Sequence, residues 1–162
     1  HVKSTTQGLD GLMLELHQDQ SEIIRATIFE DKCSGDPRRV FRDEIMPTFL
    51  AYHKGSRASE LLATAAALLN KTGLSGTDII NAAARVLDRD YRAYRGCLAI
   101  TPKDDSKERR DRLFKGYETL DKISPSQRIG GVFVTGHDLR GWFDELAGRA
   151  VAFIDQDRKS VV

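Results

Sequence analysis

Three ionisable side chains at the ends of two apolar segments could together perform hydrolytic chemistry. Asp10 stands near the start of "LDGLMLELH" (9–17), and Glu30 and Lys32 end the segment "EIIRATIFEDK" (22–32). The alternating leucines of the first segment and the β-branched residues of the second are typical of strands. A charged side chain is costly inside a buried strand unless it has a partner. The charged side chains of the two strands should therefore pair with one another.

A polar turn centred near Gln20 joins the two segments into a predicted antiparallel hairpin. Side chains directly opposite each other in such a pair lie about 5 Å apart and share a face. The turn predicts four facing pairs, which are Asp10 with Glu30, Leu12 with Ile28, Leu14 with Ala26, and Leu16 with Ile24. Lys32 shares the face of Glu30 because side chains alternate along a strand. The three charges should therefore converge at the end of an apolar face, whereas a slip of one residue would send Asp10 to the other face.

Two converging carboxylates offer the hard oxygen ligands that Mg²⁺ or Mn²⁺ prefers, together with water and phosphate oxygens. Lys32 beside them can contact a substrate phosphate or the attacking water. Asp31 points to the opposite face, but its backbone carbonyl could still reach the metal ion. The set predicts metal-assisted phosphodiester hydrolysis, with Asp10, Glu30 and Lys32 as catalytic residues and Asp10, Glu30 and Asp31 as metal ligands.

The placement of Asp10 in "GLDGL", a hairpin loop, and Glu30-Asp31-Lys32 at a strand end before a helix resembles the PD-(D/E)XK nuclease superfamily. The resemblance covers residues 7–55, and it implies a restriction-endonuclease-like αβββαβ core, a divalent metal (usually Mg²⁺) and cleavage of nucleic acid, most often DNA. It assigns Asp10 to the first motif aspartate, Glu30 to the second metal-binding acid and Lys32 to the catalytic lysine. The superfamily includes restriction, repair and bacterial antiviral defence nucleases.

The chain departs from that family pattern in three ways. The superfamily core opens with a helix and a strand, whereas only residues 1–6 precede the motif, so we expect residues 1–162 to be a single domain that lacks its N-terminal helix. We accordingly expect the full-length protein to have an upstream segment. The helix after Lys32 has no glutamine–tyrosine pair of the kind that some exonuclease branches show. Three helices are predicted before the next strand, more than the minimal core needs.

The rest of the chain predicts one α/β domain with the order β-β-α-α-α-β-α-β-α. Asp36 and Pro37 should start a helix that Pro47 kinks or splits, and Gly73 should end the second helix. The later elements are predicted as a helix over 76–94, a strand over 97–101, a charged helix over 104–122, a strand over 128–136 and a helix over 138–157. The last helix should bury a core stripe made of Leu139, Trp142, Phe143, Leu146, Phe153 and Ile154.

Composition narrows the possible partners and compartment. Of the 162 residues, 40% are hydrophobic and 30% are charged, which is typical of a globular domain, and the net charge of +1 excludes a generally basic nucleic-acid binder. Any phosphate contact should come from a local patch, for which Arg38, Arg39 and Arg42 are the candidates; a solvated helix face is the alternative. The two cysteines form no metal or disulfide pattern, and no apolar run is long enough to span a membrane. We expect a cytoplasmic protein.

Two functional hypotheses from different classes follow. The first is a Mg²⁺-dependent nuclease acting on nucleic acid, an endodeoxyribonuclease in the form that the resemblance implies, as the effector domain of a bacterial defence or restriction protein. It would act as a homo-oligomer or as part of a larger multidomain protein. The second is a non-catalytic α/β interaction module that binds a protein partner or nucleic acid. In that case the hairpin charges would form only a structural ion pair, which contributes little at a surface.

Overall fold

The structure is a computed structural model that describes residues 10–17, 22–136 and 139–160, and of 139–140 and 155–160 only the backbone. Its centre is a four-stranded mixed sheet in the order β1-β2-β3-β4, formed by Gly11–Leu16, Ile23–Cys33, Arg92–Ile100 and Arg128–Val134. Strands β1 and β2 are antiparallel, whereas β2, β3 and β4 run parallel. The mixed α/β fold and the predicted order of elements are confirmed, when the helical run over 37–53 is counted as one helix.

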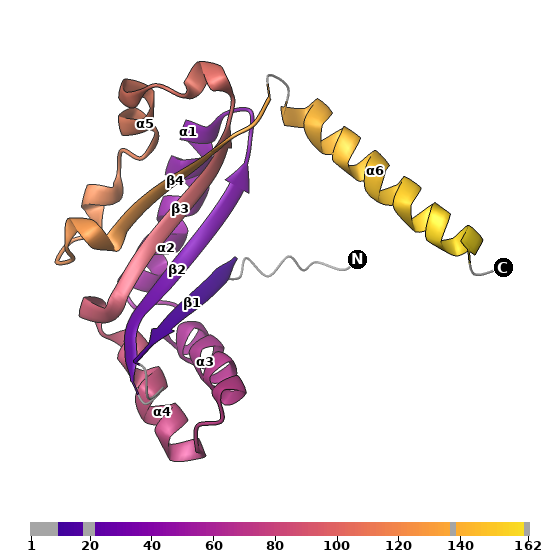
Figure 1. Cartoon of the computed structure of the whole chain (residues 1–162). Coiled ribbons are helices and arrows are strands. Elements are labelled where there is room, and N and C mark those ends of the chain that lie inside the picture. Colours follow the sequence, from indigo (N-terminus) through magenta and orange to yellow (C-terminus); the bar gives the residue numbers. More distant parts are fainter. Residues whose placement is uncertain (1–9, 18–21, 137–138, 161–162) are drawn as a thin grey trace, which may run out of the picture.

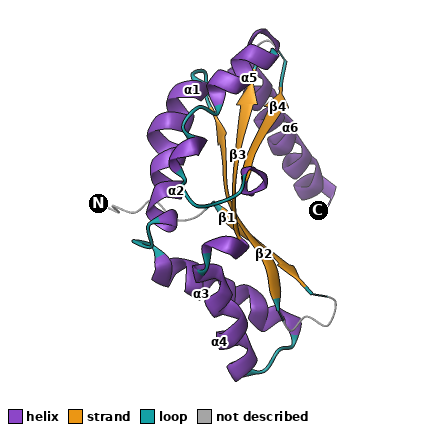
Figure 2. Ribbon diagram, turned by 90° about the vertical axis from the view of Figure 1, so that its left-hand side faces the viewer, coloured by secondary structure: helices purple, strands orange, loops and turns teal. Residues whose placement is uncertain are grey.

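The helices that connect β2 to β3 supply the helical side of the core (Figure 1). Between β2 and β3 the chain forms α1 (Pro37–Val40), α2 (Met46–His53), α3 (Ala58–Leu69) and α4 (Gly76–Ala84). The short helix α5 (Lys107–Leu113) lies between β3 and β4, and α6 (Leu139–Ser160) follows β4. Figure 2 shows α1 and α2 on one side of the sheet and α6 on the other. The core therefore lies between one sheet face and the first four helices.

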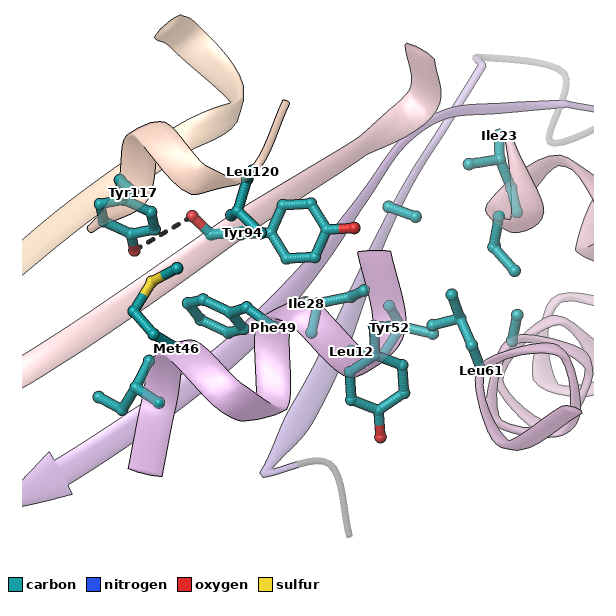
Figure 3. Close-up of a cluster of buried hydrophobic side chains, with 14 of the residues drawn as sticks. Leu12, Ile23, Ile28, Met46, Phe49, Tyr52, Leu61, Tyr94, Tyr117 and Leu120 are labelled. Carbon is teal, nitrogen blue, oxygen red and sulfur yellow. Dashed lines mark hydrogen bonds between the residues drawn. The ribbon is translucent and has the colours of Figure 1, made fainter. Parts of the chain in front are cut away.

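The core cluster joins side chains from the sheet and the helices (Figure 3). Leu12 and Ile28 come from the hairpin, Tyr94 comes from β3, and Phe49 and Leu61 come from the helices. All are buried, and the rings of Phe49 and Tyr94 lie 5.4 Å apart between centroids. Burial of large side chains of this kind is the main stabilising contribution to such a fold. This core fixes the hairpin against the helices and thus fixes the direction of the charged strand ends.

The helical run over 37–53 begins where its sequence predicts and changes its helical geometry before Pro47. The side chain of Asp36 accepts a hydrogen bond from Arg39 N, and Pro37 occupies the first turn. Before Pro47 the helix widens into a π-helical segment, Phe41–Ile45, in which Met46 N donates to Phe41 O. Proline has no N–H and crowds the preceding turn, so a widened turn relieves the conflict. The expected disruption at Pro47 thus takes the form of a π-helical segment inside one continuous helical run.

The predicted hairpin register is correct over most of its length and wrong at its far end. Leu12 pairs with Ile28 and Leu14 with Ala26, as expected. Leu16, however, pairs with Ile23 and not with Ile24, because a bulge shifts the register between Glu15 and Leu16. The bulge places Ile23 in the core and leaves Ile24 52% exposed. An extra residue in one strand re-aims the following side chains, and the turn composition gave no sign of it.

Two predicted helices are shorter than expected. The helix expected over 76–94 ends at Ala84, and β3 begins at Arg92, five residues before its predicted start. Pairing with β2, which starts at Ala26 opposite Arg92, overrides the local helical pattern there. The charged helix expected over 104–122 is reduced to α5, because Gly116 adopts a φ of 120° that no helix continues through. Gly73, in contrast, ends its helical segment in the left-handed conformation, as predicted.

The core stripe predicted for the last helix is wrong. The large apolar residues of the stripe that the structure describes are exposed, and they are Trp142, Phe143, Leu146, Phe153 and Ile154; Leu139 lies outside the described side chains. Helix α6 runs away from the sheet (Figure 1), and its contact with β4 is made near its start, where the Trp142 ring meets Phe133. Helical periodicity predicts that such a face is apolar, but it does not predict what covers the face. No helix of the described chain has the length and hydropathy needed to cross a membrane.

This difference predicts contrasting effects for two phenylalanine truncations. Phe153→Ala should change the free energy of unfolding by less than about 0.5 kcal/mol, because the side chain is 72% exposed. Phe49→Ala should cost about 3–5 kcal/mol, because it leaves a cavity in the core. Urea unfolding of both variants checks the prediction. A loss above about 2 kcal/mol for Phe153→Ala would show that the stripe is buried after all.

Candidate functional site

The hairpin brings Asp10, Glu30 and Lys32 together, as the sequence predicted. Asp10 immediately precedes β1, and the register set by Leu12 and Ile28 places it opposite Glu30. Asp10 N lies 3.5 Å from Glu30 Oε1, and Asp31 N donates to Asp10 Oδ2 at 3.2 Å. These backbone contacts fix the aspartate across the end of β2. The site is therefore a consequence of strand pairing, and a slipped register would separate its charges.

The ammonium group of Lys32 lies between the two carboxylates. Lys32 Nζ is 2.5 Å from Asp10 Oδ2 and 3.0 Å from Glu30 Oε2. Both carboxylates thus present oxygen atoms to a single small cation. Two carboxylates with one ammonium leave the cluster with a formal charge of −1. Charge-assisted contacts of this length are stronger than neutral hydrogen bonds.

The three groups differ in exposure, and the pKa of each is shifted from its ordinary value by burial and by its charged neighbours. The Glu30 side chain is only 4% exposed, against 34% for Asp10 and 29% for Lys32. Burial raises the pKa of Glu30 above its ordinary value, although Lys32 opposes the shift. Burial acts in the same sense on Asp10, but the hydrogen bond and charge of Lys32 outweigh it and lower the Asp10 pKa. Lys32, although burial opposes this, has a raised pKa because both carboxylates stabilise its charged form.

Gly96 on the neighbouring strand explains how Glu30 becomes buried. It pairs with Glu30 across β2 and β3, and its missing side chain leaves room for the helical run. A Cβ atom at Gly96 would meet Tyr117 Oη at 3.0 Å and the Phe41 ring at 3.1 Å. Tyr117 Oη in turn accepts from Gly96 N at 2.7 Å and donates to Ile129 O at 2.7 Å. The glycine therefore allows close packing beside the acid, a role that the sequence analysis did not identify.

The carboxylate of Asp31 lies outside the cluster. Its two oxygen atoms accept from Arg95 Nη2 at 3.3 and 3.0 Å, and the Arg95 guanidinium also lies over the Phe29 ring. Side chains alternate along β2, so this pair stands on the sheet face opposite Glu30 and Lys32. The predicted role of Asp31 as a metal ligand could involve only its backbone carbonyl, and it stays a prediction.

The three arginines predicted to bind nucleic acid all have partners within the protein. Arg38 Nη1 donates to the backbone oxygens of Leu113 and Lys115 at 3.1 and 2.6 Å, which ties α1 to the end of α5. Arg42 forms two hydrogen bonds with Asp43, at 2.6 and 2.8 Å. Arg39 lies 3.9 Å from Asp36 and 4.0 Å from Glu44, contacts that contribute little at an exposed position. Their role in nucleic-acid binding stays a prediction.

The donor set fits Mg²⁺ or Mn²⁺ better than the other common protein metals. Among the described residues, no group of three or more His, Cys, Asp and Glu side chains could hold a metal ion. Structural zinc sites need four nitrogen or sulfur ligands, and calcium sites need six to eight oxygens. Mg²⁺ instead accepts one or two carboxylates and completes its coordination with water and substrate phosphate. Asp10 and Glu30 provide that minimal set.

Comparisons of the chain with protein-family models, curated proteins and solved structures gave no match. The function of the chain therefore has to be inferred from the geometry and chemistry of the site.

Because Glu30 is buried more deeply than Asp10 and Lys32, two substitutions should have opposite effects on the stability of the metal-free protein. Lys32→Ala should destabilise the protein by about 1–3 kcal/mol, because it leaves the buried Glu30 beside Asp10 without a cation. Glu30→Gln should leave stability unchanged or raised, because it removes a buried charge while Lys32 keeps its contact with Asp10.

Urea unfolding in EDTA at neutral pH measures both effects, and Lys71→Ala, an exposed lysine on another part of the chain, provides the control. The described charge arrangement would be contradicted if Lys32→Ala left the free energy of unfolding unchanged while Glu30→Gln lowered it strongly.

Proposed function

We propose that this protein is a metal-dependent nuclease that hydrolyses phosphodiester bonds in nucleic acid, with DNA as its substrate. The observation that carries this proposal is the convergence of Asp10, Glu30 and Lys32 at one end of a shared sheet face. A structural ion pair needs only one acid and one base. Here a second carboxylate, almost fully buried, is held against the first, and the single ammonium of Lys32 leaves the pair with a net negative charge that a divalent cation would compensate.

Asp10 and Glu30 would hold the Mg²⁺ or Mn²⁺ ion. When bound, such an ion lowers the pKa of water and neutralises negative charge on the phosphate. Glu30 is fixed in orientation because β2 is paired on both sides, with β1 and with β3. The sheet thus positions the backbone of this ligand in advance, and the side chain that would have to move to admit the ion is Lys32, which contacts both carboxylates.

Lys32 would supply the positive charge beside the scissile phosphate. Its side chain is 29% exposed, so it lies at the protein surface. Negative charge develops on the phosphoryl oxygens during hydrolysis, and a cation placed there stabilises the transition state more than the ground state.

The strand topology agrees with the proposal. The antiparallel β1–β2 hairpin, the helical connection and the parallel strand β3 follow the order β-β-α-β. This order corresponds to the last four elements of the αβββαβ core that the family resemblance implies. The proposed setting is the nuclease domain of a cytoplasmic bacterial defence or restriction protein.

The proposal predicts that Asp10→Asn, Glu30→Gln and Lys32→Ala each abolish Mg²⁺-dependent cleavage while the fold survives. Asn and Gln keep the side-chain shape but lose the negative charge that holds a hard cation. Removal of the Lys32 cation should lower the rate on the order of a hundredfold or more. Cleavage of plasmid DNA in Mg²⁺, Mn²⁺ and EDTA, paired with melting curves of each variant, measures both properties.

Asp31→Asn is the matched control, because it removes a carboxylate next to Glu30 but on the opposite sheet face and keeps the backbone carbonyl. It should retain cleavage. Full cleavage by Glu30→Gln would end the assignment at this site. A wild-type protein that cuts neither DNA nor RNA, and whose melting temperature does not respond to Mg²⁺ or Mn²⁺, would favour the non-catalytic interaction module.

A further inference from the structure

A basic pocket lies between α1, the turn that follows β3, and α5. Its volume is about 470 Å³, and the charged side chains that line it are Asp36, Arg38, Lys103, Asp104, Arg109 and Arg112. The hydrogen bonds from Arg38 to the end of α5 hold its walls together. Figure 1 shows α1 and α5 near the end of the sheet toward which β2 runs.

The cations of this pocket fall into two groups. Arg109 pairs with Asp104 at 3.0 Å, so its charge is compensated. Lys103 and Arg112, in contrast, form no hydrogen bond or ion pair through their side chains within the described chain, and both are exposed. Arg38 donates to carbonyl groups, which provide no negative charge.

The two acids of the lining reduce its positive charge without cancelling it, because four cations and two carboxylates leave a net formal charge of +2. The carboxylate of Asp36 caps the helical run by accepting from Arg39 N, and Asp104 is paired with Arg109. Arg110, one helical position from Arg109, is paired with Asp105 and does not line the pocket. The lining therefore keeps a net positive charge that suits an anion, and Lys103 and Arg112 are its cations without a partner among the described residues.

The pocket and the candidate site open at the same edge of the sheet. Gly35, which lines the pocket, follows Lys32 by three residues, a stretch of chain that spans at most about 11 Å. Lys103 follows the last residue of β3, Ile100, by three residues. Because β2 and β3 are parallel, both chains leave the sheet at this edge.

We propose that this pocket binds a backbone phosphate of the nucleic acid, a few nucleotides from the phosphate at Lys32, with Lys103 and Arg112 as its ligands. The inference rests on the proposed nuclease function and adds a subsite to it. Arg112 presents a planar fork of donors and Lys103 a point charge, and both are suited to phosphate oxygens. Such contacts position the strand without reading its sequence. The volume leaves space for the adjoining sugar beside the phosphate.

Binding measured without cleavage tests this subsite separately from catalysis. A fluorescein-labelled DNA duplex is titrated with protein in EDTA over a series of salt concentrations, and binding is followed by fluorescence anisotropy. The double variant Lys103→Ala/Arg112→Ala should bind about tenfold more weakly and reduce the salt slope by about 1, as expected for one lost phosphate contact. The matched double variant Lys71→Ala/Lys107→Ala removes the same charge from exposed positions outside the pocket and should bind like the wild type.

Steady-state cleavage by the same variants gives a second readout. Loss of the subsite should raise KM about tenfold and leave kcat within about twofold, because the contact is made equally in the ground state and the transition state. A change in kcat alone would contradict a binding role. Melting curves should show that both double variants are folded.

Equal affinity and equal salt slope for the wild type and the Lys103→Ala/Arg112→Ala variant would overturn the subsite while leaving the nuclease proposal in place. Loss of cleavage in Glu30→Gln with retained binding supports the nuclease proposal and is independent of the pocket. A wild-type protein that binds no nucleic acid would overturn both. If inorganic phosphate or a mononucleotide raised the melting temperature of the wild type but not of the pocket variant, and DNA binding were unchanged, the pocket would belong to a free phosphate compound.

Discussion

The contact of Lys32 with both Asp10 and Glu30 is the interaction on which the site depends. A carboxylate that is almost fully removed from water costs several kcal/mol unless it is paired and hydrogen-bonded. Lys32 reaches Glu30 Oε2 at 3.0 Å and Asp10 Oδ2 at 2.5 Å, so one cation serves two acids. The opposite shifts in the pKa of the two acids follow from this shared partner and their unequal burial. Pairs of acids whose environments push their pKa values apart are typical of functional sites.

The helical run packs against one face of the sheet and so holds in place the strands that carry this cluster. The π-helical segment before Pro47 and the absent side chain of Gly96 let the helical run pack directly against β3, next to Glu30. Strand pairing on both sides of β2 holds the charged end in place. The same edge of the sheet carries the basic pocket, whose walls are joined by Arg38. The proposed metal site and the proposed phosphate subsite would thus lie at one edge of the sheet, and backbone cleavage of nucleic acid would use both.

The sequence predicts what depends on local geometry. Alternation along two strands joined by a polar turn sets the register through Leu12 and Ile28, and the convergence of the three charges follows from that register alone. The cap at Asp36 and the helix end at Gly73 are also local, and the structure has both.

Features that depend on distant partners could not be predicted. The Arg38 side chain is held by carbonyls about 75 positions away in the chain, and no pattern around Arg38 indicates them. The start of β3 at Arg92 depends on its pairing with β2, and the bulge after Glu15 depends on the core position that Ile23 fills. The basic pocket combines segments from three parts of the chain. The exposed stripe of α6 has the periodicity of a buried one, because periodicity reports the composition of a face and not its neighbours.

The most direct test of the account is the location of a bound metal ion. Crystals of the protein soaked in Mn²⁺ should give an anomalous scattering peak within coordination distance of the Asp10 and Glu30 carboxylates, with Lys32 Nζ displaced from its contact between them. The peak should be absent from crystals of Glu30→Gln grown and soaked in the same way. A Mn²⁺ peak at another position, or no peak in the wild type while Lys32 keeps both contacts, would contradict the claim that this cluster is a metal site.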